Sequence, residues 1–218
     1  MPYRWDDDYG ARVGVMKRGD DSGPVRWFDV DPCYVFHPLN AYEDAGRITI
    51  EVARYPELWR AGTARFDLAS LHRWELDTAS GEVRETPLDD RPIEFPRIDD
   101  RLCGLRHRYG YAVRNLSSSD DAATSLLKYD LKSGVSVEHD FGAGRFPGEA
   151  AFAPDPSSTE EDAGWLMSFV YDAAADRSDL VILDAQRFAA PPAATIHLPA
   201  RVPFGFHGNW MPDERGLG

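Results

Sequence analysis

The sequence predicts an all-β fold made of β-propeller blades, because strand patterns repeat along the chain while helical periodicity is scarce. A unit of one strand and a polar turn at residues 71–81 recurs at 126–134, and a third copy without the turn glycine lies at 180–186. Corresponding positions of successive copies are 55 and 54 residues apart. Strand-rich units that repeat at roughly 40–50 residues are typical of propellers, in which each blade is a small antiparallel sheet. A β-sandwich is the alternative, but sandwiches do not repeat at this period.

Further strands of alternating apolar residues complete each repeated unit. Before the first copy, the pattern predicts strands at 12–16 and 47–54, and the segment 25–29 leads into the stretch that contains His37. Apolar segments precede the second and third copies at 110–114 and 165–171, and return strands follow the three copies at 83–86, 135–139 and 194–198. Exposed polar loops are expected at 117–123 and 155–162. The chain is therefore expected to hold about four blades.

Composition and charge disfavour several classes of function. The 218 residues carry a formal net charge of −13, and such a surface repels nucleic acid and anionic lipid headgroups. No run of about 18 apolar residues exists, so no membrane-spanning helix is expected, and the charged N-terminus does not resemble a signal peptide. Cys33 and Cys103 are too far apart in sequence for a zinc knuckle and are expected to be reduced thiols, so we expect a cytoplasmic protein.

Four polar residues stand in similar apolar surroundings and point to a metal centre. His37, Glu94, Glu149 and His207 follow one another at intervals of 57, 55 and 58 residues. If they occupy equivalent points on successive innermost strands, they converge on the propeller axis. A neutral imidazole binds a divalent transition metal through one nitrogen, while a glutamate fixes the N–H of the other.

The remaining motifs favour structural roles. Four histidines neighbour charged residues or strand ends and fall at no common point of the repeat: His72, His107, His139 and His197. The glycine-rich segment 142–148 lacks the lysine and the following helix of a phosphate loop, so it is interpreted as a turn. No catalytic residue beyond the metal site and no site for an organic cofactor is predicted.

The four motifs that contain these polar residues resemble those of the carotenoid oxygenase family. They lie at 36–43, 93–96, 147–150 and 205–208. The family comprises carotenoid cleavage oxygenases, lignostilbene dioxygenases and the retinal pigment epithelium isomerase. The resemblance covers nearly the whole chain but only the C-terminal half of a family member. It implies that residues 1–218 are the C-terminal part of a single catalytic domain, a seven-bladed propeller with a non-haem Fe(II) on its axis.

The resemblance also assigns roles to individual residues. Family members hold the iron with four histidines, and three glutamates support those ligands. By motif, His37 and His207 resemble the third and fourth ligands, and Glu94 and Glu149 resemble two of the three glutamates. We expect Glu94 to pair with His37 and Glu149 with His207. The other two histidines and the third glutamate would lie in an upstream N-terminal half.

The activity implied by the resemblance is oxidative cleavage of a hydrophobic alkene. O₂ would add across a conjugated C=C bond of a carotenoid or apocarotenoid, and the bond would split into two carbonyl products. Cleavage of a stilbene is one alternative, and a non-catalytic propeller fragment that only binds partners is another. With two histidines, this chain by itself is expected to bind iron poorly and to be inactive.

Overall fold

The computed structural model of the chain describes residues 3–20, 22–60, 68–114 and 124–213, and these residues form four antiparallel sheets. A two-stranded sheet pairs β1 (Ala11–Val15) with β2 (Arg26–Val30). Blade I consists of β3 (Tyr34–Asp44), β4 (Arg47–Tyr55), β5 (Ser70–Asp77) and β6 (Val83–Pro87). Blade II consists of β7 (Ile93–Arg97), β8 (Tyr109–Arg114), β9 (Ser125–Asp130) and β10 (Val135–Asp140), with a 3-10 turn at Asp100–Leu102. Blade III consists of β11 (Arg145–Pro147), β12 (Ala151–Pro154), β13 (Gly164–Asp172), β14 (Arg177–Asp184) and β15 (Ala194–His197).

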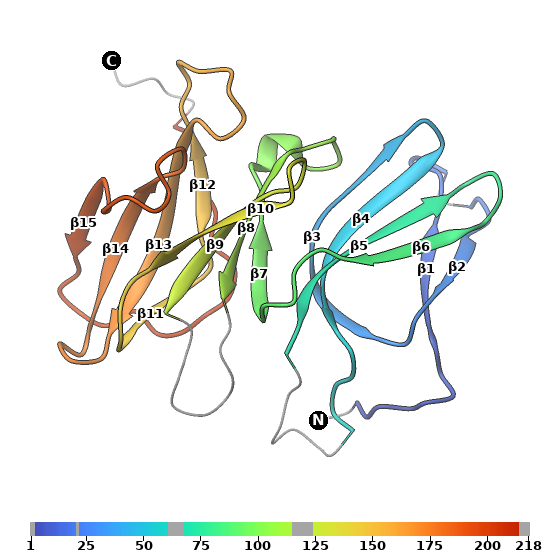
Figure 1. The fold of residues 1–218 in the computed structure, drawn as a ribbon, viewed down its shortest axis with the longest axis horizontal. Coiled ribbons are helices and arrows are strands. Elements are labelled where there is room, and N and C mark those ends of the chain that lie inside the picture. Colours follow the sequence, from blue (N-terminus) through green and yellow to red (C-terminus); the bar gives the residue numbers. More distant parts are fainter. Residues whose placement is uncertain (1–2, 21, 61–67, 115–123, 214–218) are drawn as a thin grey trace.

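Each blade follows the chain in simple up-and-down order, as the repeat predicts. The three copies of the repeated unit form the turns from β5 to β6, from β9 to β10, and from β14 towards β15. The blades succeed one another across Figure 1, from blade I on the right to blade III on the left, with β1 and β2 beyond blade I. The predicted all-β propeller architecture is therefore confirmed, as an open arc of blades.

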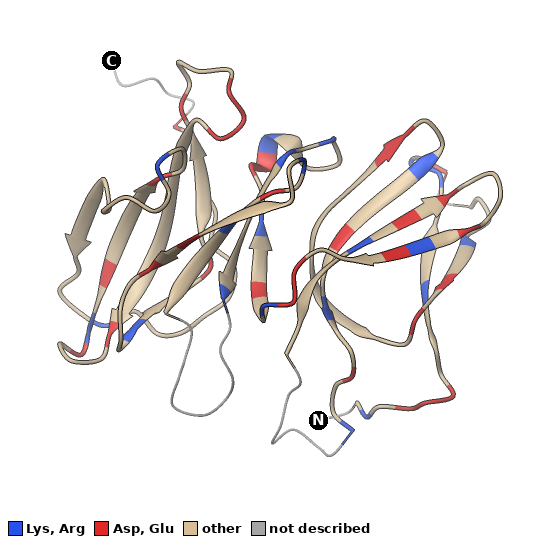
Figure 2. Ribbon diagram, viewed as in Figure 1, with Lys and Arg blue, Asp and Glu red and all other residues tan. Residues whose placement is uncertain are grey.

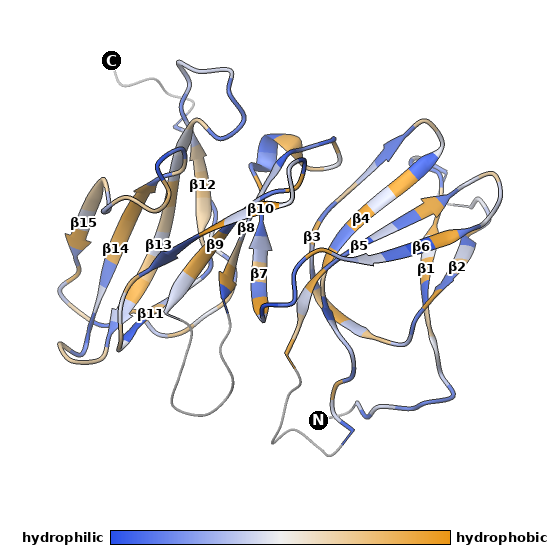
Figure 3. Ribbon diagram, viewed as in Figure 1, coloured by the Kyte–Doolittle hydropathy of each residue, from blue (hydrophilic) through white to orange (hydrophobic). Residues whose placement is uncertain are grey.

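The hydrophobic core lies between the blades. Blade II shows why, because neighbouring residues of one strand pack on opposite sides: Leu127 joins the cluster shared with blade I, and Leu126 joins the cluster shared with blade III. Successive side chains of a strand point to opposite faces, so a strand that is apolar throughout can serve two interfaces. Figure 3 shows apolar stretches along β12 and β14 of blade III. A third cluster, around Phe28 and Trp74, joins β2 to blade I.

Three regions differ from the expected set of equivalent blades. The sheet before blade I has two strands in the described residues, β1 and β2. The segment after β15 forms no strand within the described residues 198–213. The expectation that His207 lies on an innermost strand is therefore wrong. The first strand of blade III is also interrupted, because β11 and β12 are separate and both pair with β13. The predicted loop at 117–123 lies outside the described residues, and 155–162 connects β12 to β13 as expected.

Acidic and basic residues alternate along the strands and loops of the described chain in Figure 2. Both cysteines are free thiols, Cys33 partly buried and Cys103 exposed. Within the described residues, no helix is long and apolar enough to cross a membrane.

Candidate metal centre

The residues expected at the centre lie where the regular pairing of strands is interrupted. His37 stands on β3 next to Pro38, and the register between β3 and β4 shifts on both sides of this proline. Proline has no backbone N–H to give to a ladder, so it is accommodated at such a bulge. Glu94 stands on β7 before Phe95, whose φ of 52° is left-handed, and the pairing with β8 shifts between Glu94 and Arg97. Bulges re-aim side chains next to active sites.

Glu149 lies in the gap between β11 and β12. The strand β13 holds the residue before Glu149: the Gly148 N–H donates to the Phe169 carbonyl at 2.8 Å, and the Ser168 hydroxyl donates to the Gly148 carbonyl at 2.9 Å. These two bonds hold the Pro-Gly-Glu turn against the sheet. The innermost edge of blade III therefore presents a carboxylate where a regular strand would continue its ladder.

His37 and Glu94 form the first hydrogen-bonded pair. His37 Nδ1 donates to Glu94 Oε2 at 2.6 Å, because the carboxylate oxygen can only accept. The neutral ring therefore carries its proton on Nδ1 and leaves the lone pair on Nε2. Glu94 also accepts the Tyr55 hydroxyl at 2.7 Å and the Phe95 N–H at 2.7 Å, so its buried oxygens, with 6% of the side chain exposed, are satisfied by neutral donors.

Tyr55 is suited to its task as a donor. It is 5% exposed at the end of β4, and burial, followed by the neighbouring Glu94 carboxylate, raises the pKa of Tyr55 well above its ordinary value. The hydroxyl thus keeps its proton over the whole physiological range. Tyr55 links blade I to Glu94 of blade II, beside the histidine that also comes from blade I.

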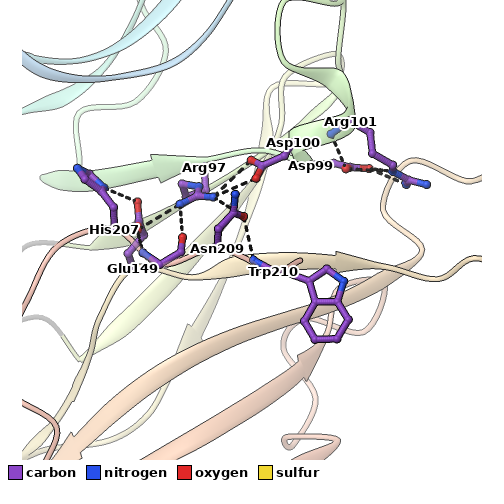
Figure 4. Close-up of polar contacts among 9 residues, drawn as sticks. Arg97, Asp99, Asp100, Arg101, Glu149, His207, Asn209 and Trp210 are labelled. Carbon is purple, nitrogen blue, oxygen red and sulfur yellow. Dashed lines mark hydrogen bonds and ion pairs between the residues drawn. The ribbon is translucent and has the colours of Figure 1, made fainter. Parts of the chain in front are cut away.

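His207 and Glu149 form the second pair, shown in Figure 4. His207 Nδ1 donates to Glu149 Oε1 at 3.1 Å, and the Gly208 N–H donates to Oε2 of the same carboxylate at 3.0 Å. Arg97 Nη1 lies 3.2 Å from Glu149 Oε2. The carboxylate is 8% exposed, whereas the His207 side chain is 58% exposed, so the glutamate is fixed and the ring remains accessible.

The two imidazoles converge although they come from blade I and from the segment after blade III. Their ring centroids are 5.0 Å apart and their planes are inclined by 77°. An ion about 2.1 Å from Nε2 lies about 3.2 Å from the ring centre, so two rings on adjacent positions of one ion have centroids roughly 4.5 to 5.5 Å apart. In the described residues no hydrogen bond engages Nε2 of either ring. The separation of the rings thus matches that of two imidazoles on adjacent positions of a transition-metal ion.

Two histidines alone do not make a complete metal site. Among the described residues, no group of three or more His, Cys, Asp or Glu side chains is arranged to hold a metal. The other four histidines bind elsewhere, to Ser70 (His72), Asn40 (His107), the Phe188 carbonyl (His139) and Asp179 (His197), in keeping with the structural roles expected for them.

The structure brings together the two histidines and the two glutamates that the sequence indicates, and each histidine is hydrogen-bonded to the glutamate expected for it. Sequence reasoning missed Tyr55 and Arg97. Arg97 follows Glu94 closely in Glu-Phe-Pro-Arg, but arginine on a strand is usually exposed, so the sequence does not distinguish it from a surface residue. Tyr55 lies outside all four motifs, and only the fold places it beside Glu94.

Comparisons with known proteins find relatives that match nearly the whole chain. The sequence profile of the retinal pigment epithelial membrane protein family matches residues 1–212. The chain is 41% identical to a carotenoid cleavage oxygenase from Mycobacterium tuberculosis, over 97% of this chain and 44% of the relative. It is 34% identical to an apocarotenoid-15,15′-oxygenase from Synechocystis (93% and 43%) and 34% identical to an isoeugenol monooxygenase from Pseudomonas putida (96% and 48%). The chain therefore spans less than half the length of these relatives.

The fold is similar to that of solved structures as well. A crystal structure of the cobalt-substituted Synechocystis oxygenase superposes with a TM-score of 0.85 at 31% identity, covering 95% of this chain and 45% of that one. A variant of the same cyanobacterial enzyme also superposes with a TM-score of 0.85. Sequence profile, identity and superposition agree, and the chain belongs to the carotenoid oxygenase family, the family of the retinal pigment epithelial membrane protein.

Proposed function

We propose that residues 1–218 are the C-terminal part of a single catalytic propeller domain in a non-haem iron(II) dioxygenase, with Nε2 of His37 and Nε2 of His207 as iron ligands. The observation that carries this proposal is the 5.0 Å approach of two imidazoles, each of which donates Nδ1–H to a buried glutamate. Neutral imidazole suits iron(II), and a carboxylate on the far nitrogen orients the ring and raises its basicity. Two further histidines and a third glutamate would come from an upstream half of the protein.

The proposed substrate is a carotenoid or apocarotenoid, as the names of the mycobacterial and cyanobacterial relatives suggest. Iron(II), when bound, supplies the activation of O₂ for cleavage of a conjugated C=C bond, and one O₂ accounts for both carbonyl oxygens of the products. No reductant or organic cofactor is required.

The chain's own residues prepare the site for such a substrate. The Phe95 ring lies 5.3 Å from His37 and 6.4 Å from Phe206, so aromatic side chains flank the imidazoles. Such aromatic surfaces suit an apolar polyene. Glu94 and Glu149 hold the rings and their tautomers in place while the substrate binds.

Cleavage of a stilbene or a related phenylpropenoid is the second candidate, favoured by the 34% identity to isoeugenol monooxygenase. This reaction would use the same ligands and differ in the substrate. Products from an apocarotenoid and from a hydroxystilbene, offered separately to the assembled protein, distinguish the two.

The test is reconstitution with iron(II) under anaerobic conditions, with the chain co-expressed with the N-terminal half of the mycobacterial relative. One iron per assembled propeller is expected, and His37→Ala and His207→Ala should each abolish its retention. His197→Ala is the matched control, because His197 also donates to a carboxylate, Asp179, at 2.7 Å but lies away from the centre on β15. Absence of iron from the assembled wild-type protein would contradict the proposal and favour a non-catalytic propeller fragment.

A further inference from the structure

Residues 207–209 hold a proposed ligand but belong to no strand. Within the described chain, the hydrogen bonds that join this segment to other segments go to two side chains, Glu149 and Arg97. No ladder of backbone bonds fixes the direction of His207, in contrast to His37 on β3. The place of this imidazole therefore depends on what holds those two side chains.

Arg97 makes contacts that no other residue of the centre combines. Its Nη1 donates to the Gly208 carbonyl at 2.8 Å and lies 3.2 Å from Glu149 Oε2. Its Nη2 donates to Asn209 Oδ1 at 3.2 Å and reaches the Asp100 carboxylate at 3.3 Å. A guanidinium presents five donors in a rigid fork, so one side chain can bind a carboxylate, a carbonyl and an amide at once. Figure 4 shows this arrangement.

The two glutamates of the centre differ in their electrostatic surroundings. Glu94 accepts from neutral donors, whereas Glu149 faces the Arg97 guanidinium. A buried carboxylate that loses its cationic partner is left uncompensated, which is costly. With its side chain 15% exposed, Arg97 provides this compensation from within the protein. Its removal would therefore weaken the hold of Glu149 on His207 as well as the direct bonds to residues 208 and 209.

We infer that Arg97 is a positioning residue of the candidate metal centre, which fastens the C-terminal segment to β7 so that His207 faces His37. Arg97 acts through Glu149 and Gly208. The assignment of His207 as a metal ligand rests on the proposed function, whereas the fastening is a property of this chain and can be measured without metal.

Two substitutions separate charge from geometry. Arg97→Gln removes the cation, and Arg97→Lys keeps the cation but cannot reproduce the fork. Arg101→Gln is the matched control, because Arg101 lies four residues along the chain and binds Asp99 through its own fork, at 2.6 Å, without touching the centre. The readouts are amide hydrogen exchange of a peptide covering 204–212, the ¹⁵N shifts of the His207 ring, and the Co²⁺ dissociation constant of the chain assembled with the upstream half.

Arg97→Gln is expected to abolish the exchange protection of 204–212 while peptides from β13 and β14 remain protected, and to turn the His207 ring shifts into those of a free tautomer mixture. Co²⁺ affinity should fall roughly 10- to 100-fold, as for other residues that orient metal ligands. Arg97→Lys should lie between wild type and Arg97→Gln, and it carries the test if the glutamine variant does not fold. Wild-type exchange and ring shifts in the folded Arg97 variants would overturn the inference.

The metal measurement separates this inference from the proposed function. If no protein, wild type included, binds Co²⁺, the proposed function fails while the exchange and ring shifts still decide the role of Arg97. If wild type binds Co²⁺ and both Arg97 variants bind it equally well, the positioning role is wrong and the metal site stands.

Discussion

The imidazoles of His37 and His207 lie 5.0 Å apart between their ring centroids, although one belongs to the first strand of blade I and the other to the segment after blade III. Each ring gives its Nδ1–H to a glutamate from a different blade, Glu94 in blade II and Glu149 in blade III. The convergence therefore depends on the packing of all three blades.

Replacement of Glu94 by glutamine should weaken metal binding and release the tautomer of His37. A carboxamide oxygen accepts a hydrogen bond less strongly than a carboxylate, and its NH₂ group can be turned towards the ring instead. The Co²⁺ dissociation constant of the assembled protein should rise roughly 10- to 100-fold. Glu138→Gln, which alters a carboxylate bound to Arg114 at 2.7 Å on β10, should leave it unchanged. Equal affinities for Glu94→Gln and wild type would contradict the role of Glu94.

Tyr55→Phe should lower the free energy of unfolding by about 1 to 3 kcal/mol, because it removes one of three donors from a buried carboxylate. Urea denaturation followed by tryptophan fluorescence measures the change. Tyr171→Phe removes a hydroxyl that donates to Asp176 at the surface and should change stability by less than about 0.5 kcal/mol. Similar effects of both substitutions would show that Glu94 does not depend on Tyr55.

The buried histidine His107 should make the fold sensitive to acid. Burial, together with the nearby Arg73 cation, lowers the pKa of His107 from 6.5 to about 4. Between these two values the unfolded chain takes up a proton that the folded chain does not, so stability falls as the pH falls through this window. Above it both states are neutral, and below it the loss is complete.

His107→Gln removes this contribution. Between pH 7 and pH 4.5, the free energy of unfolding of the wild type should fall by on the order of 2 kcal/mol relative to that of the variant. Glu51 lies 4.0 Å from His107, and burial raises the pKa of its carboxyl. Its effect on the pH dependence of stability has the opposite sign to that of His107. Because the variant retains Glu51, the comparison with the variant isolates the effect of His107. A pH-independent difference would show that folding does not lower the pKa of His107.

Gly164→Ala should destabilise blade III. A Cβ at position 164 would lie 2.4 Å from the Ala153 carbonyl oxygen and 2.8 Å from the Phe152 ring. The backbone of β12 would have to shift to relieve this overlap. The expected cost is about 1 to 3 kcal/mol by urea denaturation. At Gly148, a Cβ would meet the Phe169 carbonyl oxygen at an ordinary 3.5 Å, so Gly148→Ala should be tolerated. Equal costs at the two positions would contradict the steric account.

The blades could be predicted from the sequence because they depend on local patterns. Period-two alternation and turn residues mark the strands around residues 71–81 and 126–134, and tertiary packing preserves them. The strand β11 could not be predicted in the same way, since the glycine-rich segment 142–148 indicates a turn, whereas residues 145–147 pair with β13. The contacts of Gly148 with Ser168 and Phe169 then set the gap before β12.

The candidate centre could be predicted in part for a related reason. Histidine and glutamate in apolar surroundings are unusual, so the four residues stand out along the chain. The supporting residues Tyr55 and Arg97 do not stand out in the sequence, because tyrosine and arginine occur in many environments. Only the packing of the blades brings them to the centre. The spacing also suggested a fourth equivalent strand for His207, whereas the segment 198–213 reaches the centre without one.

Because β7 bulges at Phe95, residues 94–97 contact both halves of the centre. Glu94 accepts a hydrogen bond from His37, and Arg97 binds the Glu149 carboxylate, which holds His207. Gain or loss of a single residue within this tetrapeptide would disconnect both sides together, whereas the hairpin turns between blade strands can vary in length at little cost. To build this centre into another propeller, residues 94–97 must therefore be transferred together, with the left-handed backbone conformation of Phe95 retained.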